Sequence, residues 1–591
     1  MKKSLSLIVY ITSILSGTSC SHYLDKEFDA SLSEEKVFGN ATMTREFLTN
    51  IYTNLPDGIG IYNDPQFLGA SRDCMTDNSV SFWGLHYYTK IATDNYTATD
   101  HPLLGFWGNN FNGIRKCNQF LKYVDPTNPN NPHPDKSVIS NSEVPGDDNH
   151  LRDRYVAEAK FMRALFHFEL VDYFGNTPIL ENQIFDLSDQ AAMNTPRKDA
   201  AEVLKWIADQ CDAIKDVLPF RYSSDGNWGR INGAAAYALK SRALLYRASA
   251  LHNSSNDKSW WTEAANAAKD FITKNTASVT PFKLYPDYQK SFYETPYQND
   301  ELILSRSIWY TNAIETNLLP YGFSGCSGRT NPTQNFVDSY EMSNGKMIDE
   351  AGSGYNPQKP YDNRDPRLEA TIFHEGSVWG RADYNEQRAI DVTTGGKDYR
   401  GDLGGTFTGY YLKKFVNPDM VMQDKKTFAH VWVIYRYAEI LLNYAEALNE
   451  AGATSSEVSA PLNEVRKRAG QPELAAGLSQ DALRKKIRNE RRVELCFEDH
   501  RFFDLRRWKA YEGVTATNET SKPRYEQLLN LYVTTVTATG GVPKYTGTTV
   551  NQNVKDDNIQ TRVFNSPKNY LFPIPYNEVV KAPNLVQNQG W

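Results

Sequence analysis

Apolar residues recur every three to four positions over several long segments of the chain, which is the pattern of helices that bury one face. The clearest segments are residues 151–174, 196–218, 232–251, 260–271, 434–449 and 457–468. They form neighbouring pairs, which we interpret as antiparallel hairpins. Residues 434–470 span one such pair, close to the period of about 34 residues of a tetratricopeptide unit. We therefore predict a mostly α fold, in which tetratricopeptide-like helix hairpins form a superhelical scaffold.

Residues 276–429 break this rhythm, because they are rich in Gly, Pro, Asn and Tyr, and only residues 301–309 resemble a strand. We predict a large loop-rich, partly β insertion that faces the ligand, between scaffold parts at about 30–275 and 430–510. In the tail, residues 511–591, apolar residues alternate with Pro573 and Pro575. This tail should run extended and pack back on the scaffold. Residues 20–591 are predicted to be a single domain.

Residues 488–508, RNERRVELCFEDHRFFDLRRW, place two carboxylates among apolar residues. Glu490 and Glu494 share a helical arc with Ile487 and Val493, and a carboxylate there is costly to desolvate unless it is paired. The predicted partners are the nearby arginines Arg491, Arg492, Arg501, Arg506 and Arg507. A helix should end near Glu498, with a turn at residues 499–500 and a short second helix. The carboxylate pair could instead be the acid and base of a glycoside hydrolase.

The first residues read as a signal peptide, residues 1–19. Lys2 and Lys3 supply its positive charge, a short apolar run follows, and small residues precede Cys20. A cysteine directly after such a leader is typical of a bacterial lipoprotein. We predict that Cys20 is lipidated and anchors the protein to a membrane; plain secretion with an incidental Cys20 is the alternative.

Charge and motifs exclude several classes of protein. The net charge is −7, and loss of Lys2 and Lys3 with the leader makes it −9, which disfavours nucleic acid as a partner, as do the acids interleaved among the arginines of residues 481–509. No nucleophile, zinc-protease or phosphate-loop motif is present, so no catalytic residue and no cofactor is predicted. Structural calcium at residues 147–148, or at Asp362 and Asp365, is an alternative use of these acids. Apart from Cys20, five scattered cysteines fit neither a disulfide framework nor a zinc site, namely Cys74, Cys117, Cys211, Cys326 and Cys496.

Aromatic residues are abundant, with 35 Tyr, 28 Phe and 11 Trp, and some of them stand in polar loop sequence. Trp83, Tyr87, Tyr321 and Trp379 lie among Gly, Ser and Asn. Flat rings in loops can stack on the apolar faces of sugars. We predict that these four residues supply a ligand-binding aromatic platform. The alternative is that each ring fixes its own loop to the core.

Four segments together resemble one family. They are residues 436–452 (RYAEILLNYAEALNEAG), 462–470 (LNEVRKRAG), 488–508 and 571–591. They resemble the SusD/RagB family of outer-membrane nutrient-binding lipoproteins, and residues 362–367 (DNRDPR) resemble a further family motif, interpreted as an ion-paired turn.

The resemblance implies a non-catalytic, lipid-anchored protein on the cell surface. Such a protein binds an oligo- or polysaccharide and works with a SusC-like TonB-dependent transporter in the outer membrane. The family's ligand contacts lie in variable loops, so the resemblance assigns none of them here. A helical-repeat scaffold that binds a peptide or protein is the remaining alternative.

Overall fold

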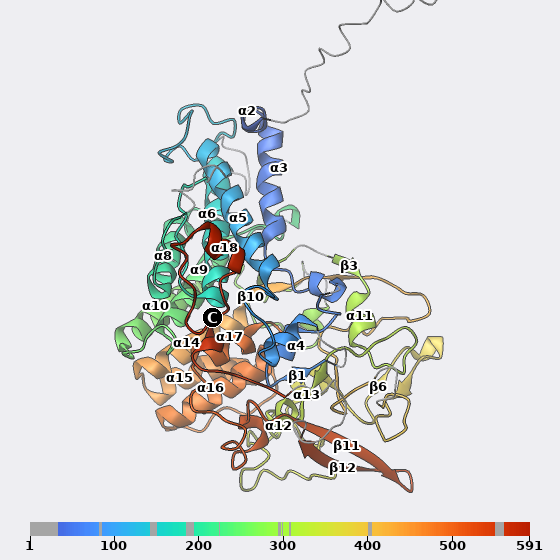
Figure 1. The fold of residues 1–591 in the computed structure, drawn as a ribbon. Helices are drawn as coiled ribbons and strands as arrows, with labels where there is room; N and C mark the ends of the chain where they lie inside the picture. Colours follow the sequence, from blue (N-terminus) through green and yellow to red (C-terminus); the bar gives the residue numbers. More distant parts are fainter. Residues whose placement is uncertain are drawn as a thin grey trace, which may run out of the picture.

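The computed structural model describes residues 33–591, apart from residues 65, 82–85, 142–150, 185–193, 224, 294–296, 298, 307–308, 400–404 and 550–560. Long helices fill one side of the molecule, and loops with short strands fill the other (Figure 1). The predicted signal peptide, Cys20, Trp83 and residues 147–148 lie outside the described residues.

The scaffold consists of helices that pack on their neighbours in the chain. Its first part contains α5 (Leu104–Val124), α6 (Leu151–Phe174), α8 (Ala200–Ile214), α9 (Gly233–Ala248) and α10 (Lys258–Thr276), and its second part contains α14 (Tyr437–Ala451), α15 (Ser455–Arg468), α16 (Gln480–Glu494) and α17 (His500–Arg507). Helix α10 packs on both α9 and α14, so the two parts join side by side although some 160 residues separate α10 from α14 along the chain. The predicted mostly helical fold is confirmed.

Local sequence explains where these helices begin and end. Thr454 and Glu457 form a reciprocal capping box that starts α15, and Gly452 ends α14 in the left-handed conformation with φ of 91°. Gly233 starts α9 where an added Cβ would lie 2.4 Å from the Lys215 carbonyl oxygen, so only glycine permits this approach of α9 to the end of α8. Helix α6 differs from the predicted amphipathic helix. Because other helices surround it, 18 of its 24 residues are buried.

The insertion is built from short antiparallel strand pairs. Strand β2 (Leu302–Ser305) pairs with β10 (Val433–Arg436), and β3 (Trp309–Thr311) pairs with β9 (Phe428–His430). These pairs bring the beginning and the end of the insertion together. Three further pairs are β1 (Ser79–Val80) with β4 (Asn331–Pro332), β5 (Ile372–Phe373) with β8 (Tyr411–Leu412), and β6 (Val378–Trp379) with β7 (Arg388–Ala389). Short helices α11 (Ala313–Leu318) and α13 (Pro366–Thr371) lie between strands.

Part of the tail packs on the scaffold, and the tail is not wholly extended. Phe572 and Ile574 are buried in the main hydrophobic core, and α18 (Tyr576–Lys581) follows them. A hairpin of β11 (Tyr532–Thr539) and β12 (Val542–Thr549) was not predicted; it turns at two glycines with positive φ, Gly540 and Gly541. In the described part of the chain, none of the helices is both long enough and apolar enough to cross a bilayer.

Candidate functional site

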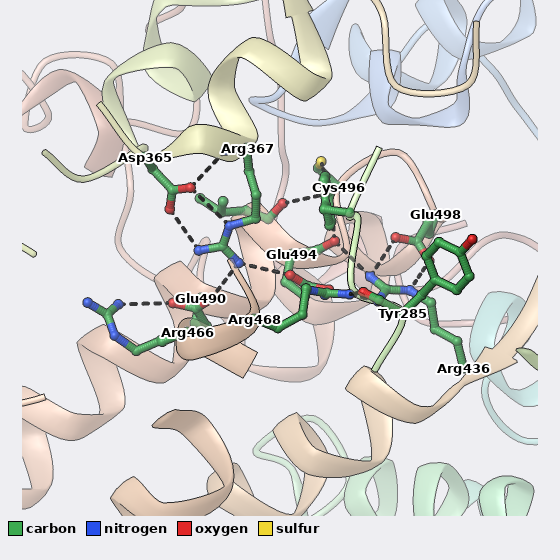
Figure 2. A network of polar contacts seen from close by, with 12 residues as sticks. Tyr285, Asp365, Arg367, Arg436, Arg466, Arg468, Glu490, Glu494, Cys496 and Glu498 are labelled. Atoms are coloured by element: carbon green, nitrogen blue, oxygen red, sulfur yellow. Dashed lines mark hydrogen bonds and ion pairs between the residues drawn. The ribbon is translucent and has the colours of Figure 1, made fainter. Parts of the chain in front are cut away.

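A buried network of ion pairs surrounds the end of α16 (Figure 2). Glu494, which is fully buried, accepts hydrogen bonds from Arg367 at 2.9 Å, from Arg436 at 2.7 Å and from Arg468. Glu490 accepts from Arg367 at 2.6 Å and from Arg466. The partners come from α13, from β10 and from α15. The network therefore connects α13 of the insertion with β10 and with helices α15 and α16 of the scaffold.

The prediction that Glu490 and Glu494 are buried and paired is confirmed, but the predicted partners are wrong. The nearby arginines turn to other acids. Arg491 and Arg507 pair with Asp504 and Glu446, and Arg492 and Arg501 pair with Asp77, while Arg506 stacks over Phe502. The reason is geometric, because α16 ends at Glu494 rather than near Glu498, and Phe497 and Asp499 reverse the chain with positive φ.

The network leaves no role for Glu490 and Glu494 as a hydrolytic acid and base. Both carboxylates are buried, and their oxygens are bonded to guanidinium groups. Burial alone would raise the pKa of Glu494, but Arg468, Arg436 and Arg367 outweigh it and hold this pKa well below its usual range. A general acid needs the opposite shift and access to the substrate.

These depressed pKa values predict acid sensitivity. Burial would raise the pKa of Glu498, but Arg436 and Lys414 lower it, as the arginines do for Glu494. A carboxylate with a lowered folded-state pKa stabilises the fold above its unfolded pKa, and this contribution is lost as the pH falls. We expect the free energy of unfolding to fall steadily below about pH 4.5. In urea titrations, Glu494→Gln should make this fall shallower; an equally steep fall would contradict the assignment.

The motif of residues 362–367 forms the ion-paired turn that was predicted. Asp365 caps α13 by accepting from the Arg367 backbone N–H at 2.9 Å, and it pairs with the Arg367 guanidinium at 2.7 Å. Asp365 is therefore committed to Arg367 rather than to calcium. Across the residues that the structure describes, no group of three or more His, Cys, Asp or Glu side chains could hold a metal ion.

Other chemistry-bearing residues are structural. The five cysteines are free and buried. His167 is buried, contacts the Arg163 carbonyl oxygen at 2.8 Å and accepts from the Leu180 N–H. Burial lowers the pKa of His167 to about 3, so it is a neutral core histidine.

The structure describes three of the four candidate platform residues, and their surroundings differ. Trp83 lies outside the described residues. Tyr87 is not in a loop but begins the short helix α4 (Tyr87–Ala92), where it is half-buried beside Phe67. Trp379 is in strand β6 and only 7% exposed, with its ring 5.1 Å from Phe373, so its faces are covered.

Tyr321 is the described candidate with the most exposed ring. It follows α11 in a turn and is 36% exposed. In the described part of the chain, no ring contact joins Tyr321 to Tyr87 or Trp379.

Two more exposed rings lie at the start of the insertion and were missed. Trp309 and Tyr310 on β3 are 40% and 75% exposed, and the Trp309 indole N–H donates to Asp57 at 3.1 Å. Trp309 is the last residue of the strand-like run of residues 301–309. Two adjacent aromatic residues at its polar end, before Thr311 and Asn312, were the signal that could have identified them.

The fold combines a helical scaffold, a loop-rich insertion and a buried arginine network. Comparison with known proteins assigns a chain with these features to one family. Residues 305–591 match the model of the SusD family, and residues 22–245 match a related model described as starch-binding associating with outer membrane. The chain belongs to the SusD/RagB family.

Individual relatives are similar over most of their length. The SusD-like protein P2 of Formosa agariphila is 25% identical over 468 residues, which cover 76% of each chain. A solved SusD-like protein from Bacteroides fragilis is 25% identical with a TM-score of 0.73, and the match covers 95% of this chain and 99% of the other. A solved SusD-like carbohydrate binding protein from the same species has 25% identity and a TM-score of 0.69, with 93% and 100% covered.

Proposed function

We propose that this protein is a non-catalytic glycan-binding protein of the cell surface. Lipidated Cys20 would anchor it to the outer membrane, and it would deliver an oligo- or polysaccharide to a SusC-like TonB-dependent transporter. Family membership supports this proposal, because one matched family description is starch-binding and outer-membrane-associated, and one similar solved structure is described as carbohydrate binding.

The observation that carries the proposal is the exposure of Trp309 and Tyr310 on the loop-rich side. Successive side chains of a strand point to opposite faces, so each of the two rings offers its own exposed apolar surface. Such faces suit the C–H surface of a sugar ring, and the bond from the Trp309 indole to Asp57 fixes the orientation of that ring. Tyr321, and Trp83 beyond the described residues, remain candidates for the same platform.

Removing an exposed ring should weaken binding without unfolding the protein. We expect Tyr310→Ala to lower affinity for a bound polysaccharide about tenfold, by analogy with other ring-stacking contacts. The measurement is calorimetric titration against a polysaccharide panel, with melting temperature recorded for each variant. Tyr576→Ala is the matched control, since Tyr576 is an exposed ring on α18.

Three outcomes would contradict the proposal. Unchanged affinity in Tyr310→Ala and Trp309→Ala would remove the platform. Release of shortened sugars would identify an enzyme, and binding to peptides but to no glycan would identify a helical-repeat scaffold.

A further inference from the structure

A cleft lies beside the scaffold, where α8 and α10 end and α9 begins. Its cavity of about 460 Å³ is lined by the loop between α8 and α9, by residues that follow α10, and by β2. A neighbouring hollow of about 440 Å³ shares Trp228 and Arg230 with it and continues to Tyr52 and Arg306. Because the two hollows share lining residues, they adjoin each other, and we refer to the pair as the groove. Each is within the size range of small-ligand sites.

Two aromatic rings line this cleft. Trp228 and Tyr297 meet edge to face, with centroids 5.1 Å apart and planes at 68°. Tyr297 is 46% exposed and Trp228 is half-buried, so neither ring is sealed in the core. Trp228 stands between Asn227 and Gly229, in the polar loop sequence that is typical of a stacking platform.

The groove is basic although the chain is acidic overall. Arg221, Arg230 and Lys283 line the cavity and Arg306 lines its continuation, whereas Asp300 is the only acid among the described lining residues. Arg230 is held in place by two-pronged bonds to buried Glu158. Glu158 offsets Arg230, and Asp57 lies 3.6 Å from Arg306, so the preference for an anionic ligand rests on Arg221 and Lys283.

Arg221 is placed so that a ligand anion can share or replace its ion pair with Asp300. Its Nη2 donates to Asp300 at 2.6 Å, but the Asp300 side chain is more than half exposed. Exposed ion pairs of this kind contribute little to stability, so a ligand carboxylate or sulfate could share the guanidinium at small cost. Lys283 is exposed beside it and adds a second cation.

We propose that this cleft is a second saccharide site, selective for sugars that carry a carboxylate or a sulfate ester. The Trp228 and Tyr297 rings stack on the sugar, and Arg221 and Lys283 bind its anionic group. The inference rests on the proposed function in that the ligand is a saccharide, but it concerns residues separate from Trp309 and Tyr310.

The test compares three probes on the intact protein: an oligogalacturonate, a sulfated carrageenan oligosaccharide and neutral maltoheptaose. We expect one or both anionic probes to bind, more weakly at high salt. Trp228→Ala and Tyr297→Ala should each weaken that binding about tenfold, while Trp228→Phe keeps most of it. Arg221→Gln combined with Lys283→Gln should weaken anionic binding about tenfold and leave maltoheptaose binding unchanged.

A charge-matched control is Lys198→Gln combined with Lys274→Gln, since these exposed lysines pair with surface acids outside the cleft. It should leave anionic binding unchanged.

The effects of the separate variants on binding also distinguish this inference from the proposed function. If anionic binding depends on Tyr310 but not on Trp228 or Arg221, the cleft is not a site and the proposed function stands.

If no glycan of either kind binds, both proposals fail. A tetraglutamate peptide that binds through Arg221 and Lys283 while the sugars do not would instead identify an acidic peptide site, and would overturn the saccharide assignment.

Discussion

Replacing Glu494 with alanine will lower the free energy of unfolding by about 3–5 kcal/mol. The carboxylate is fully buried and binds Arg367, Arg436 and Arg468. Its removal leaves these buried guanidinium groups with one compensating charge fewer, and this costs more than the lost bonds themselves. Arg436 keeps Glu498 and Glu301, Arg367 keeps Asp365 and Glu490, and Arg468 keeps Glu301, so the three arginines share the cost.

The measurement is urea unfolding of the purified variant, with Glu202→Ala as the control. Glu202 is exposed and pairs with Lys198 on the surface, so its removal should change the unfolding free energy by less than about 1 kcal/mol. Glycan affinity of the folded Glu494→Ala protein should match that of the wild type. A stable variant that loses activity alone would contradict a structural role and restore the hydrolase hypothesis.

The scaffold could be predicted because its helices carry their own signals. Residues 151–174 were predicted and observed with the same bounds, and the third hairpin differs only at its ends. Periodicity reports the buried face of a helix, and capping residues report its ends. Neither reports how many neighbours a helix has, which explains why α6 is buried all round instead of on one face.

The ion network shows where sequence reasoning reaches its limit. Burial of Glu490 and Glu494 followed from their place on an apolar arc, which is a local property. The choice of partners is set by tertiary packing, which brings Arg367 from 123 residues away to Glu490. Four arginines from other segments therefore take positions that the nearer arginines could not reach.

Ring exposure was the least predictable property. Trp379 lies beside Gly380 and Tyr310 beside Thr311 in the insertion, yet Trp379 packs on Phe373 and Tyr310 is 75% exposed. The difference arises from strand pairing between distant residues, because β6 turns Trp379 inward and β3 leaves Tyr310 outside. The amino-acid composition of a loop does not show which distant strands will pair.

Phe572→Ala will be the second strongly destabilising change, by about 3–5 kcal/mol. The Phe572 ring lies 5.9 Å from that of Tyr173 on α6, 6.0 Å from that of Phe502 on α17 and 5.6 Å from that of Tyr96. Its backbone N–H donates to the Tyr173 carbonyl oxygen at 2.8 Å. Truncation to alanine therefore opens a cavity where the tail joins both parts of the scaffold.

Denaturant unfolding of Phe572→Ala should show this loss, whereas Tyr576→Ala, four residues further along the tail and more than half exposed, should stay within about 0.5 kcal/mol of wild type. Glycan affinity should be unchanged, because Phe572 lines neither proposed site. A Phe572→Ala protein as stable as the Tyr576→Ala control would mean that the tail only covers the scaffold. The predicted loss would mean that the tail is part of the core, and that the scaffold needs residues near position 572 to hold α6 and α17 together.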